Sequence, residues 1–257
     1  MTLLSEHACV APGSARGARQ LAATVERVTT LDARAVAAMF ELYDSYYDAS
    51  SRALFEADLG NKHFVVMLRE PSGALAGFST LAVLEAEVED RRLRAIYSGD
   101  TIIDHAHWGT QALAFTWIRF AGAIKAWAPQ LPLYWFLIVK GHRTYRYLSA
   151  FSIDFHPHWQ APTPAPARAI MDALAARRFG DAYDPARGVV SFTQSRGHLR
   201  SEWALVEAAE AARPDVAFFL GSNPGYRHGD ELVCLTELCS GNLRPLARRV
   251  FEQGLRT

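Results

Sequence analysis

Alternating and periodic hydrophobic positions divide the first half of the chain into a regular series of strands and helices. A short strand at Val25–Val28 precedes Thr30 and Asp32, either of which could cap a helix over Ala33–Tyr47. A second short helix is expected over Ser51–Leu59. The period of the hydrophobic positions then changes, and an antiparallel meander of three strands is expected over His63–Arg69, Ala74–Ala86 and Leu93–Ile103.

A second group of elements follows the meander. An apolar helix is expected over Thr110–Trp127, and two prolines close it. The continuously apolar run Leu133–Val139 is typical of a strand that is buried on both faces. A short helix over Thr144–Ala150 and a strand over Phe151–Phe155 complete this group.

The pattern changes at Pro157, where a proline-rich connection begins. Beyond it we expect a strand over Val189–Phe192 and an apolar segment over Leu232–Leu238. Three helices are expected over Ala167–Arg178, Glu202–Ala212 and Leu243–Phe251. The chain therefore divides into a flexible leader (1–23), an α/β core (24–156) and a C-terminal α/β extension (157–257) packed on that core.

Charge and cysteine content exclude several function classes. The 257 residues carry 27 basic and 27 acidic side chains, and this balance argues against a nucleic-acid-binding protein, which needs a basic surface. Cys9, Cys234 and Cys239 are too few for a disulfide framework or a four-ligand zinc site. The sequence thus predicts an aromatic-rich globular protein.

No targeting signal is recognisable. Glu6 and His7 interrupt the start of the chain, where a secretory signal would be apolar. The most apolar stretch, Trp108–Trp127, contains Arg119 and Lys125 and is too short in its apolar part to span a bilayer. We therefore expect a cytoplasmic protein with no membrane span.

The order of elements over residues 24–156 resembles the GNAT superfamily of N-acyltransferases. The opening VERVTTLDARAVAAMFELYDSYY is similar to the family's first strand and helix, and IYSGDTIIDHAHWGTQAL to its fourth strand and the following helix. LYWFLIVKGHRTYRYLSAF resembles its fifth strand and next helix, without the family's Gly-Phe pair. The resemblance implies an α/β fold with a mixed, mostly antiparallel sheet and flanking helices.

In that family the fourth and fifth strands splay apart, and a thioester donor lies between them. Gly99 is a plausible position for the bulge that opens the splay. Phosphates of acyl-CoA or acyl-phosphopantetheine would meet the free amides at the start of the following helix. The resemblance assigns donor binding to Ile102, Ile103, Trp108, Gly109, Thr110 and Gln111.

The phosphate loop departs from the family pattern. Gly109 keeps the first glycine, but Ala106 stands where the family has Gln or Arg, and Gln111 replaces the second small residue. Three possibilities follow: an altered pyrophosphate pocket, a donor on an acyl-carrier protein with a single phosphate, or loss of carrier binding.

Acid and base candidates lie around the same place. Amide formation needs a base for the attacking amine and an acid for the leaving thiolate. Asp100, Asp104 and His105 are the candidate bases. Side chains alternate between the two faces of a strand, so even-numbered residues of this segment would lie on one face. These even-numbered polar residues are Arg94, Ser98, Asp100 and Asp104. By resemblance, Tyr145 or Tyr147 is the acid. Alternatively, Asp100 closes a turn or pairs with Arg94, and the tyrosines pack at the edge of the core.

Two histidine pairs and one polar loop offer other chemistry. His105 with His107, and His156 with His158, would each point two imidazoles the same way on a strand, as metal ligands do. The default interpretation is hydrogen-bonded loop histidines, so no metal is expected. The loop Gly221–Glu231 could be a tight connection or could line an acceptor pocket.

The leading hypothesis is acyl transfer from a thioester to the amine of a small molecule. The donor partner would be acyl-CoA or an acyl-carrier protein. One alternative is a non-catalytic ligand-binding protein with a degenerate donor site, and another is a His/Asp metal-dependent hydrolase. The tyrosine cluster Tyr43–Tyr47 would then line the acceptor side of the cleft or pack in the core.

Overall fold

The structure is a computed structural model that describes residues 21–257. Its strands are β1 (Ala22–Arg27), β2 (Tyr47–Asp48), β3 (Phe64–Arg69), β4 (Leu75–Val88), β5 (Arg91–Ile103), β6 (Leu133–Val139), β7 (Tyr183–Asp184), β8 (Val189–Val190), β9 (His198–Leu199) and β10 (Glu231–Glu237). Within the described residues, eight of them form one sheet in the order β1-β3-β4-β5-β6-β10-β8-β7. Only β5 and β6 run parallel, so the sheet is mixed and mostly antiparallel, as predicted.

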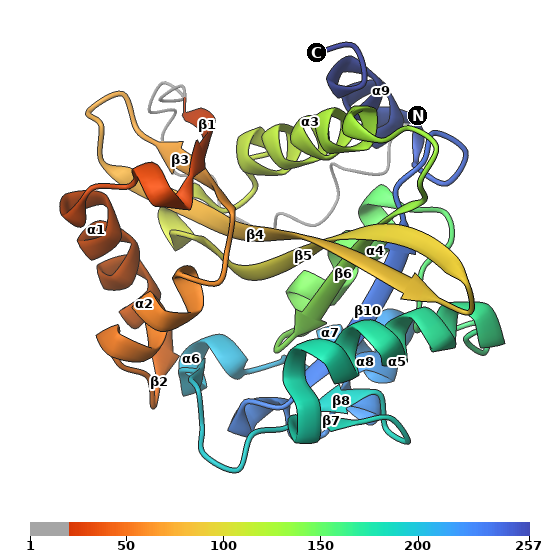
Figure 1. Cartoon of the computed structure of the whole chain (residues 1–257). Helices are drawn as coiled ribbons and strands as arrows, with labels where there is room; N and C mark the ends of the chain where they lie inside the picture. Colours follow the sequence, from red (N-terminus) through yellow and green to blue (C-terminus); the bar gives the residue numbers. More distant parts are fainter. Residues whose placement is uncertain (1–20) are drawn as a thin grey trace.

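Helices cover both faces of this sheet. They are α1 (Ala33–Asp44), α2 (Arg52–Leu59), α3 (Ala112–Trp127), α4 (His142–Phe151), α5 (Ala165–Phe179), α6 (Ser201–Ala204), α7 (Ala208–Ala211), α8 (Pro214–Ser222) and α9 (Pro245–Gly254). In Figure 1, α3 and α9 lie on one face, and α1, α2 and α5 lie on the other. Among the described helices, none combines the length and the apolar character that a membrane crossing requires.

The predicted core elements are present, with local signals that explain their ends. Asp32, rather than Thr30, caps α1, because its carboxylate accepts from the Ala35 amide at 2.7 Å. Ser51 caps α2 in the same way through the Leu54 amide. Residues 1–20 of the expected leader lie outside the described residues, while Ala22 already belongs to β1.

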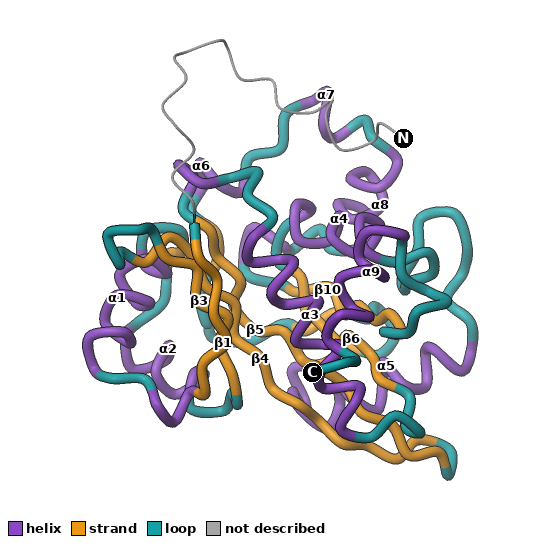
Figure 2. Tube along the Cα trace, turned by 90° about the horizontal axis from the view of Figure 1, so that it is seen from above, coloured by secondary structure: helices purple, strands orange, loops and turns teal. Residues whose placement is uncertain are grey.

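The C-terminal extension shares the sheet of the core and packs closely on it. Strands β10, β8 and β7 continue the sheet beyond β6, and α9 crosses α3, as the view from above shows (Figure 2). The two helices approach through glycines: a Cβ on Gly254 would lie 1.8 Å from the Arg119 carbonyl oxygen. A Cβ on Gly122 would lie 2.1 Å from the Phe251 carbonyl oxygen. Larger residues would force the helices apart.

Two expectations for the second half of the chain are wrong, and one helix there was not predicted. Residues 151–155 form no strand; α4 continues to Phe151, and Ser152 and His156 make only isolated bridges. The proline after His156 has no amide hydrogen with which to extend a ladder. The helix expected over Glu202–Ala212 is two short helices, α6 and α7. The apolar helix α8 was not predicted, although Pro214 occupies its favoured first position.

Candidate active site

A cavity of about 690 Å³ lies where β5 and β6 separate. The two strands pair in parallel as far as Ser98 and Leu137, and no further pairing joins them in the described chain. Residues 99–103 line the cavity on one side of the gap, and Ile138 and Lys140 line it on the other. Backbone groups that face the gap are therefore free of ladder partners, which is the splay that the resemblance implies.

A β-bulge in β5 stands at the mouth of this gap. The ladder between β4 and β5 shifts so that Gly99 and Asp100 both lie opposite Thr80. Glycine is required there for space, because a Cβ on Gly99 would lie 2.5 Å from both Lys62 Cε and Thr80 Oγ1. The predicted bulge at Gly99 is thus confirmed, and the side chain of Lys62 packs against it.

The bulge decides which way Asp100 points. Before it, even-numbered residues face α3: Ser98 accepts from Trp135 Nε1 at 2.9 Å, and Arg94 donates to a carbonyl at the end of α3 at 2.7 Å. After the bulge, Asp100 turns to the other face and lines the cavity. The shared face predicted for Arg94, Ser98, Asp100 and Asp104 is therefore wrong, because one extra residue reverses the alternation. Arg94 also makes no pair with Asp100.

The loop before α3 forms the donor-like end of the cavity. Gly109 has a φ of 91°, and nothing lies within 4 Å of a Cβ built on it, so its backbone is open to a ligand. Gln111 caps α3 without a side-chain hydrogen bond, and Thr110 Oγ1 accepts from the Ala112 amide at 3.4 Å, so the Leu113 and Ala114 amides are the ones without a capping side chain. All six predicted donor-binding residues line the cavity: Ile102, Ile103, Trp108, Gly109, Thr110 and Gln111.

Arg143 supplies a cation at this end. It lies at the start of α4, lines the cavity, and its guanidinium carbon is 4.9 Å from the centre of the Trp108 ring. The Trp108 indole also donates to the Ile103 carbonyl at 2.8 Å, so this carbonyl of the gap already has a partner. A basic group from α4 thus stands near the loop in which Ala106 replaces the expected Gln or Arg.

Buried charges gather on the cavity wall near the bulge. Lys140 Nζ lies 3.6 Å from Glu231 Oε1, and the two side chains are 13% and 10% exposed. Asp58 pairs with the fully buried ammonium of Lys62. Asp100 lies within electrostatic range of Lys140, Lys62 and Asp58, but no salt bridge or side-chain hydrogen bond joins it to another residue in the described range.

This environment shifts the pKa of each acid upward. Burial raises the pKa of Glu231 from 4.5 to about 7, although Lys140 opposes the shift. Burial, followed by the negative charge of Asp58, raises the pKa of Asp100 above its usual value. Burial opposes the charge of Lys140, but surrounding acidic groups, Glu231 first, hold its pKa above the usual range. Lys140 therefore stays cationic, while both carboxylates become stronger bases than their ordinary counterparts.

Tyrosines from α1 and the chain just after it cover these charges. The rings of Tyr43 and Tyr47 are stacked, with centroids 4.5 Å apart and planes at 6°. Lys140 Nζ lies 5.3 Å from the centre of the Tyr47 ring. Burial raises the pKa of Tyr43 to about 12, so it is a neutral phenol. Tyr43, Tyr46 and Tyr47 line the cavity, as one of the two interpretations of this cluster expected.

The two tyrosines of α4 lie in different places. Tyr147 lines the cavity and is 36% exposed, and burial raises the pKa of its hydroxyl. Tyr145 is 1% exposed and lies outside the cavity lining, and its hydroxyl donates to the Pro157 carbonyl at 2.8 Å. Of the two acid candidates, only Tyr147 can reach a ligand in the cavity.

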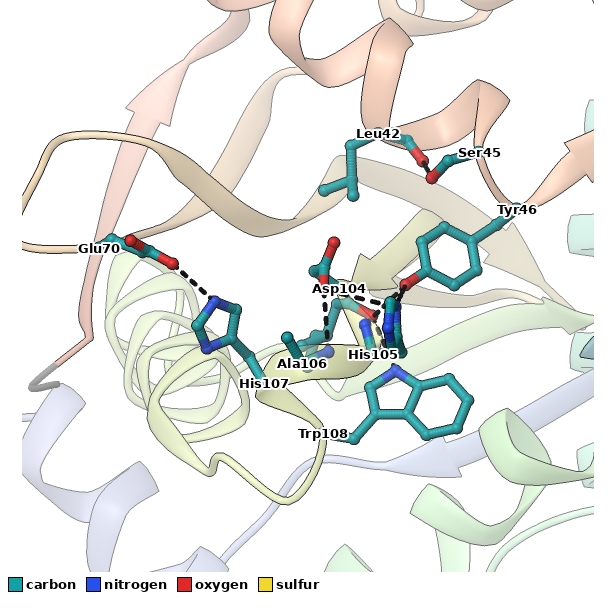
Figure 3. A network of polar contacts seen from close by, with 10 residues as sticks. Leu42, Ser45, Tyr46, Glu70, Asp104, His105, Ala106, His107 and Trp108 are labelled. Atoms are coloured by element: carbon teal, nitrogen blue, oxygen red, sulfur yellow. Dashed lines mark hydrogen bonds and ion pairs between the residues drawn. The ribbon is translucent and has the colours of Figure 1, made fainter. Parts of the chain in front are cut away.

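Asp104 and His105 lie beside the cavity rather than in its lining. Asp104 caps the short 3-10 helix His105–His107 by accepting from the Ala106 amide at 2.9 Å. The Tyr46 hydroxyl accepts from the His105 amide at 2.6 Å and lies 3.4 Å from His105 Nδ1 (Figure 3). His105 therefore positions Tyr46, which does line the cavity, while Asp104 holds the 3-10 helix that carries His105.

The histidine pairs do not form ligand pairs. Figure 3 shows His105 turned toward Tyr46 and His107 turned toward Glu70, whose Oε1 lies 3.0 Å from His107 Nε2. The predicted common direction is wrong because this segment is a 3-10 helix, not a strand. Within residues 21–257, no three His, Cys, Asp or Glu side chains are grouped in a way that could hold a metal ion.

The loop over 221–230 is a tight connection. Asn223 donates to the Asp230 carbonyl at 2.8 Å, and the Asp230 carboxylate accepts from Ser191 at 2.6 Å. Only Glu231, the last residue of the predicted loop, lines the cavity. Sequence analysis gave no role to Lys140, and Glu231 appeared only as part of that loop. The available signal was one charged residue at the end of each apolar strand, Leu133–Val139 and Leu232–Leu238.

Comparisons with known proteins give weak similarities to acyltransferase folds. No protein-family model and no curated protein matches the chain. Among solved structures, it is similar to a conserved protein of unknown function from Enterococcus faecalis V583 (13% identity, 52% of this chain, 33% of that chain, TM-score 0.38). It is also similar to a GNAT family N-acetyltransferase from Escherichia coli in complex with CoA (14% identity, 51% of this chain, 69% of that chain, TM-score 0.36). A third similar structure is a glucosamine N-acetyltransferase region of a fungal multi-domain β-N-acetylglucosaminidase (9% identity, 92% of this chain, 37% of that chain, TM-score 0.38).

Proposed function

We propose that this protein is an N-acyltransferase that moves an acyl group from a thioester donor to an amine of a small molecule. The observation that carries the proposal is the combination of splayed strands, bulge and cavity. A strand gap whose backbone groups lack ladder partners ends at an unpaired, half-buried carboxylate, Asp100, and Tyr147 lines the same cavity. These are the parts that aminolysis of a thioester needs.

The donor is acyl-CoA or acyl-phosphopantetheine. Its pantetheine arm would lie along the gap between β5 and β6, where amides and carbonyls lack ladder partners. Its phosphate would meet the open backbone of Gly109, the free amides at the start of α3 and the guanidinium of Arg143. These groups fit an anionic donor, although the loop lacks the basic residue common in the resembling family.

Each proton in the reaction has a place to go. Asp100 removes the proton from the attacking amine, and its raised pKa makes it a stronger base than an ordinary carboxylate. The amine nitrogen bonds to the thioester carbonyl carbon, and the carbon–sulfur bond then breaks. The Tyr147 hydroxyl gives its proton to the leaving thiolate. The products are an amide and a free thiol.

The test is acyl transfer by the purified chain. Acetyl-CoA, longer acyl-CoAs and an acyl-carrier protein are each incubated with a mixture of primary amines, and N-acyl products are measured by mass spectrometry. We expect amine-dependent product with at least one donor. The absence of product, together with no change in melting temperature with any donor, would overturn the proposal.

Two tyrosines of one helix provide a matched control. Tyr147→Phe removes the hydroxyl that lines the cavity and should lower kcat by about 10²-fold. Tyr145→Phe removes a hydroxyl that donates to Pro157 and should cost about 1 kcal/mol of stability while kcat stays unchanged. Equal losses of kcat in both variants would argue against Tyr147 as the acid. Donor binding without transfer would instead support the non-catalytic binding protein.

A further inference from the structure

The half of the cavity away from the Trp108 loop is walled by aromatic rings from two distant parts of the chain. Tyr43 and Tyr97 come from the core, while Phe179 and Phe192 come from the C-terminal extension. The Tyr97 and Phe179 ring centroids are 6.0 Å apart, and those of Phe179 and Phe192 are 6.4 Å apart. Such walls are complementary to a flat apolar group.

The extension is fixed over the cavity at a second point. Strand β9 pairs antiparallel with β2, next to Tyr47. Gly197, just before β9, comes so close that a Cβ on it would lie 2.5 Å from the Tyr43 hydroxyl. Tyr43 is therefore packed closely against the C-terminal extension, which fixes the relative position of the core and extension aromatics.

The charges on the wall leave one carboxylate without a partner. Lys140 pairs with Glu231, and Asp58 pairs with Lys62. The other charged lining residues also have partners: Arg143 lies over Trp108, Arg196 over Phe192, and His142 contacts Glu210. Among the charged lining residues in the described part of the chain, Asp100 alone has no ion pair, side-chain hydrogen bond or ring contact.

We propose that the acceptor is an arylalkylamine, a single primary ammonium carried by a short chain on an aromatic ring. The ring lies between the core and extension aromatics, and the ammonium meets Asp100. This inference rests on the proposed function, because it names the amine that receives the acyl group. The ammonium gives one proton to Asp100, its nitrogen forms the bond to the acyl carbon, and the carbon–sulfur bond breaks. The thiol leaves with the proton from Tyr147, and the second proton lost by the nitrogen goes to the Tyr147 phenolate.

The same wall disfavours other amines. An amino acid would bring its carboxylate close to Asp100 and Glu231, and like charges repel strongly at a buried site. A polyamine would bring several ammonium groups to a wall that has one unpaired carboxylate and mostly apolar rings, and each unmatched charge would lose its hydration. An amine with one positive charge and one aromatic ring matches the single unpaired carboxylate and the aromatic rings of this wall.

The test compares four amines with the best donor: 2-phenylethylamine, phenylalanine, 2-cyclohexylethylamine and spermidine. We expect kcat/KM for 2-phenylethylamine to exceed that for phenylalanine and for spermidine by about 100-fold or more. Saturating the ring should cost about 3- to 10-fold, because the offset and edge contacts of the aromatic ring are lost. Equal or better transfer to phenylalanine or spermidine would overturn the inference while leaving acyl transfer intact.

A variant of the extension separates this site from the donor site. Phe192→Ala should raise KM for 2-phenylethylamine by about 5- to 10-fold, with KM for the donor unchanged. Leu205→Ala is the matched control, since Leu205 belongs to the extension, is 58% exposed and lies outside the cavity lining. An unchanged amine KM in Phe192→Ala would contradict the inference. Failure of every amine with every donor would overturn the proposed function itself, and the acceptor assignment with it.

Discussion

The two ends of the cavity are built in different ways. The end at Gly109 offers mainly backbone: an open glycine, the free start of α3 and the unpaired edges of two strands. The other end offers side chains, namely Asp100, the Lys140–Glu231 pair and aromatic rings from distant segments. Backbone recognition suits a donor arm that is common to many reactions, whereas buried side chains suit one particular acceptor. The comparison predicts that variants at each end fail in different ways.

The largest effect is expected at Asp100. Asp100→Asn keeps the size of the side chain and removes the base, so kcat/KM should fall by about 10²- to 10⁴-fold, measured by product formation. Asp104→Asn is the control, because Asp104 caps a 3-10 helix beside the cavity. Comparable losses in the two variants, with unchanged melting temperatures, would show that Asp100 has no special role.

The buried ion pair should dominate stability at the acceptor end. Lys140→Met leaves the Glu231 carboxylate without its cation, and should lower the free energy of unfolding by about 3–5 kcal/mol in urea titrations. The double variant Lys140→Met, Glu231→Gln removes both charges and should regain much of that loss. If the double variant is as unstable as the single one, the two side chains are not energetically coupled.

The raised pKa of Glu231 predicts a pH dependence of stability. The folded protein binds this proton more tightly than the unfolded chain, so the stabilisation is complete below about 4.5 and is lost as pH rises through about 7. At about 1.4 kcal/mol per pKa unit, the loss is about 3 kcal/mol. Lys140, Asp100 and Asp58 surround the group, and the pKa of Asp100 is raised in the same direction.

Denaturant titrations of the original chain and of Glu231→Gln between pH 5 and pH 8 measure this effect. The variant lacks the titrating group, so its stability should fall less over that range. If the free energy of unfolding changes equally with pH in the two proteins, Glu231 does not titrate between pH 5 and pH 8. That result would contradict the raised pKa of a buried carboxyl.

Two glycines sharpen the comparison further. Gly109→Ala forces a left-handed backbone on alanine, which should cost about 1–2 kcal/mol of stability and raise KM for the donor. Gly99→Ala brings a Cβ against Lys62 and Thr80, which should cost about 1–3 kcal/mol and lower kcat, since the bulge aims Asp100. A change in the same kinetic constant for both variants would contradict the division into two ends.

The smallest effect is expected at Arg143. Arg143→Gln should raise KM for the donor by about 3- to 10-fold, with kcat unchanged, because it removes one phosphate contact at an open site. The effect should shrink as salt is added. An unchanged donor KM at low salt would show that the missing basic residue of the loop is not replaced from α4.

The sequence predicted the lining at the Gly109 end of the cavity much better than the lining at the Asp100 end. Local alternation and periodicity located the strands and helices from Val25 to Val139, and a glycine in a strand indicated the bulge. The same bulge made the predicted direction of the Asp100 side chain wrong, because one inserted residue exchanges the two faces of the strand. The donor loop is continuous in sequence, so resemblance alone could assign its residues.

The acceptor end depends on contacts between segments that are far apart in the chain. Lys140 and Glu231 meet only because β10 pairs with β6, and no short-range pattern predicts that pairing. The aromatic wall likewise needs α5 and the segment before β9 to return over the core. Interruptions such as the break between α6 and α7 also escape a periodicity argument, because only a few residues decide them.

Amide hydrogen exchange tests the central claim most directly. Adding acetyl-CoA, without an amine, should slow exchange in residues 99–103 and at the start of α3, because the donor arm fills the gap between β5 and β6 and its phosphate meets the helix. Exchange around β2 and β9 should stay unchanged until an amine is added. Unchanged exchange at the gap and at α3 under saturating acetyl-CoA and acyl-carrier donors would contradict the account.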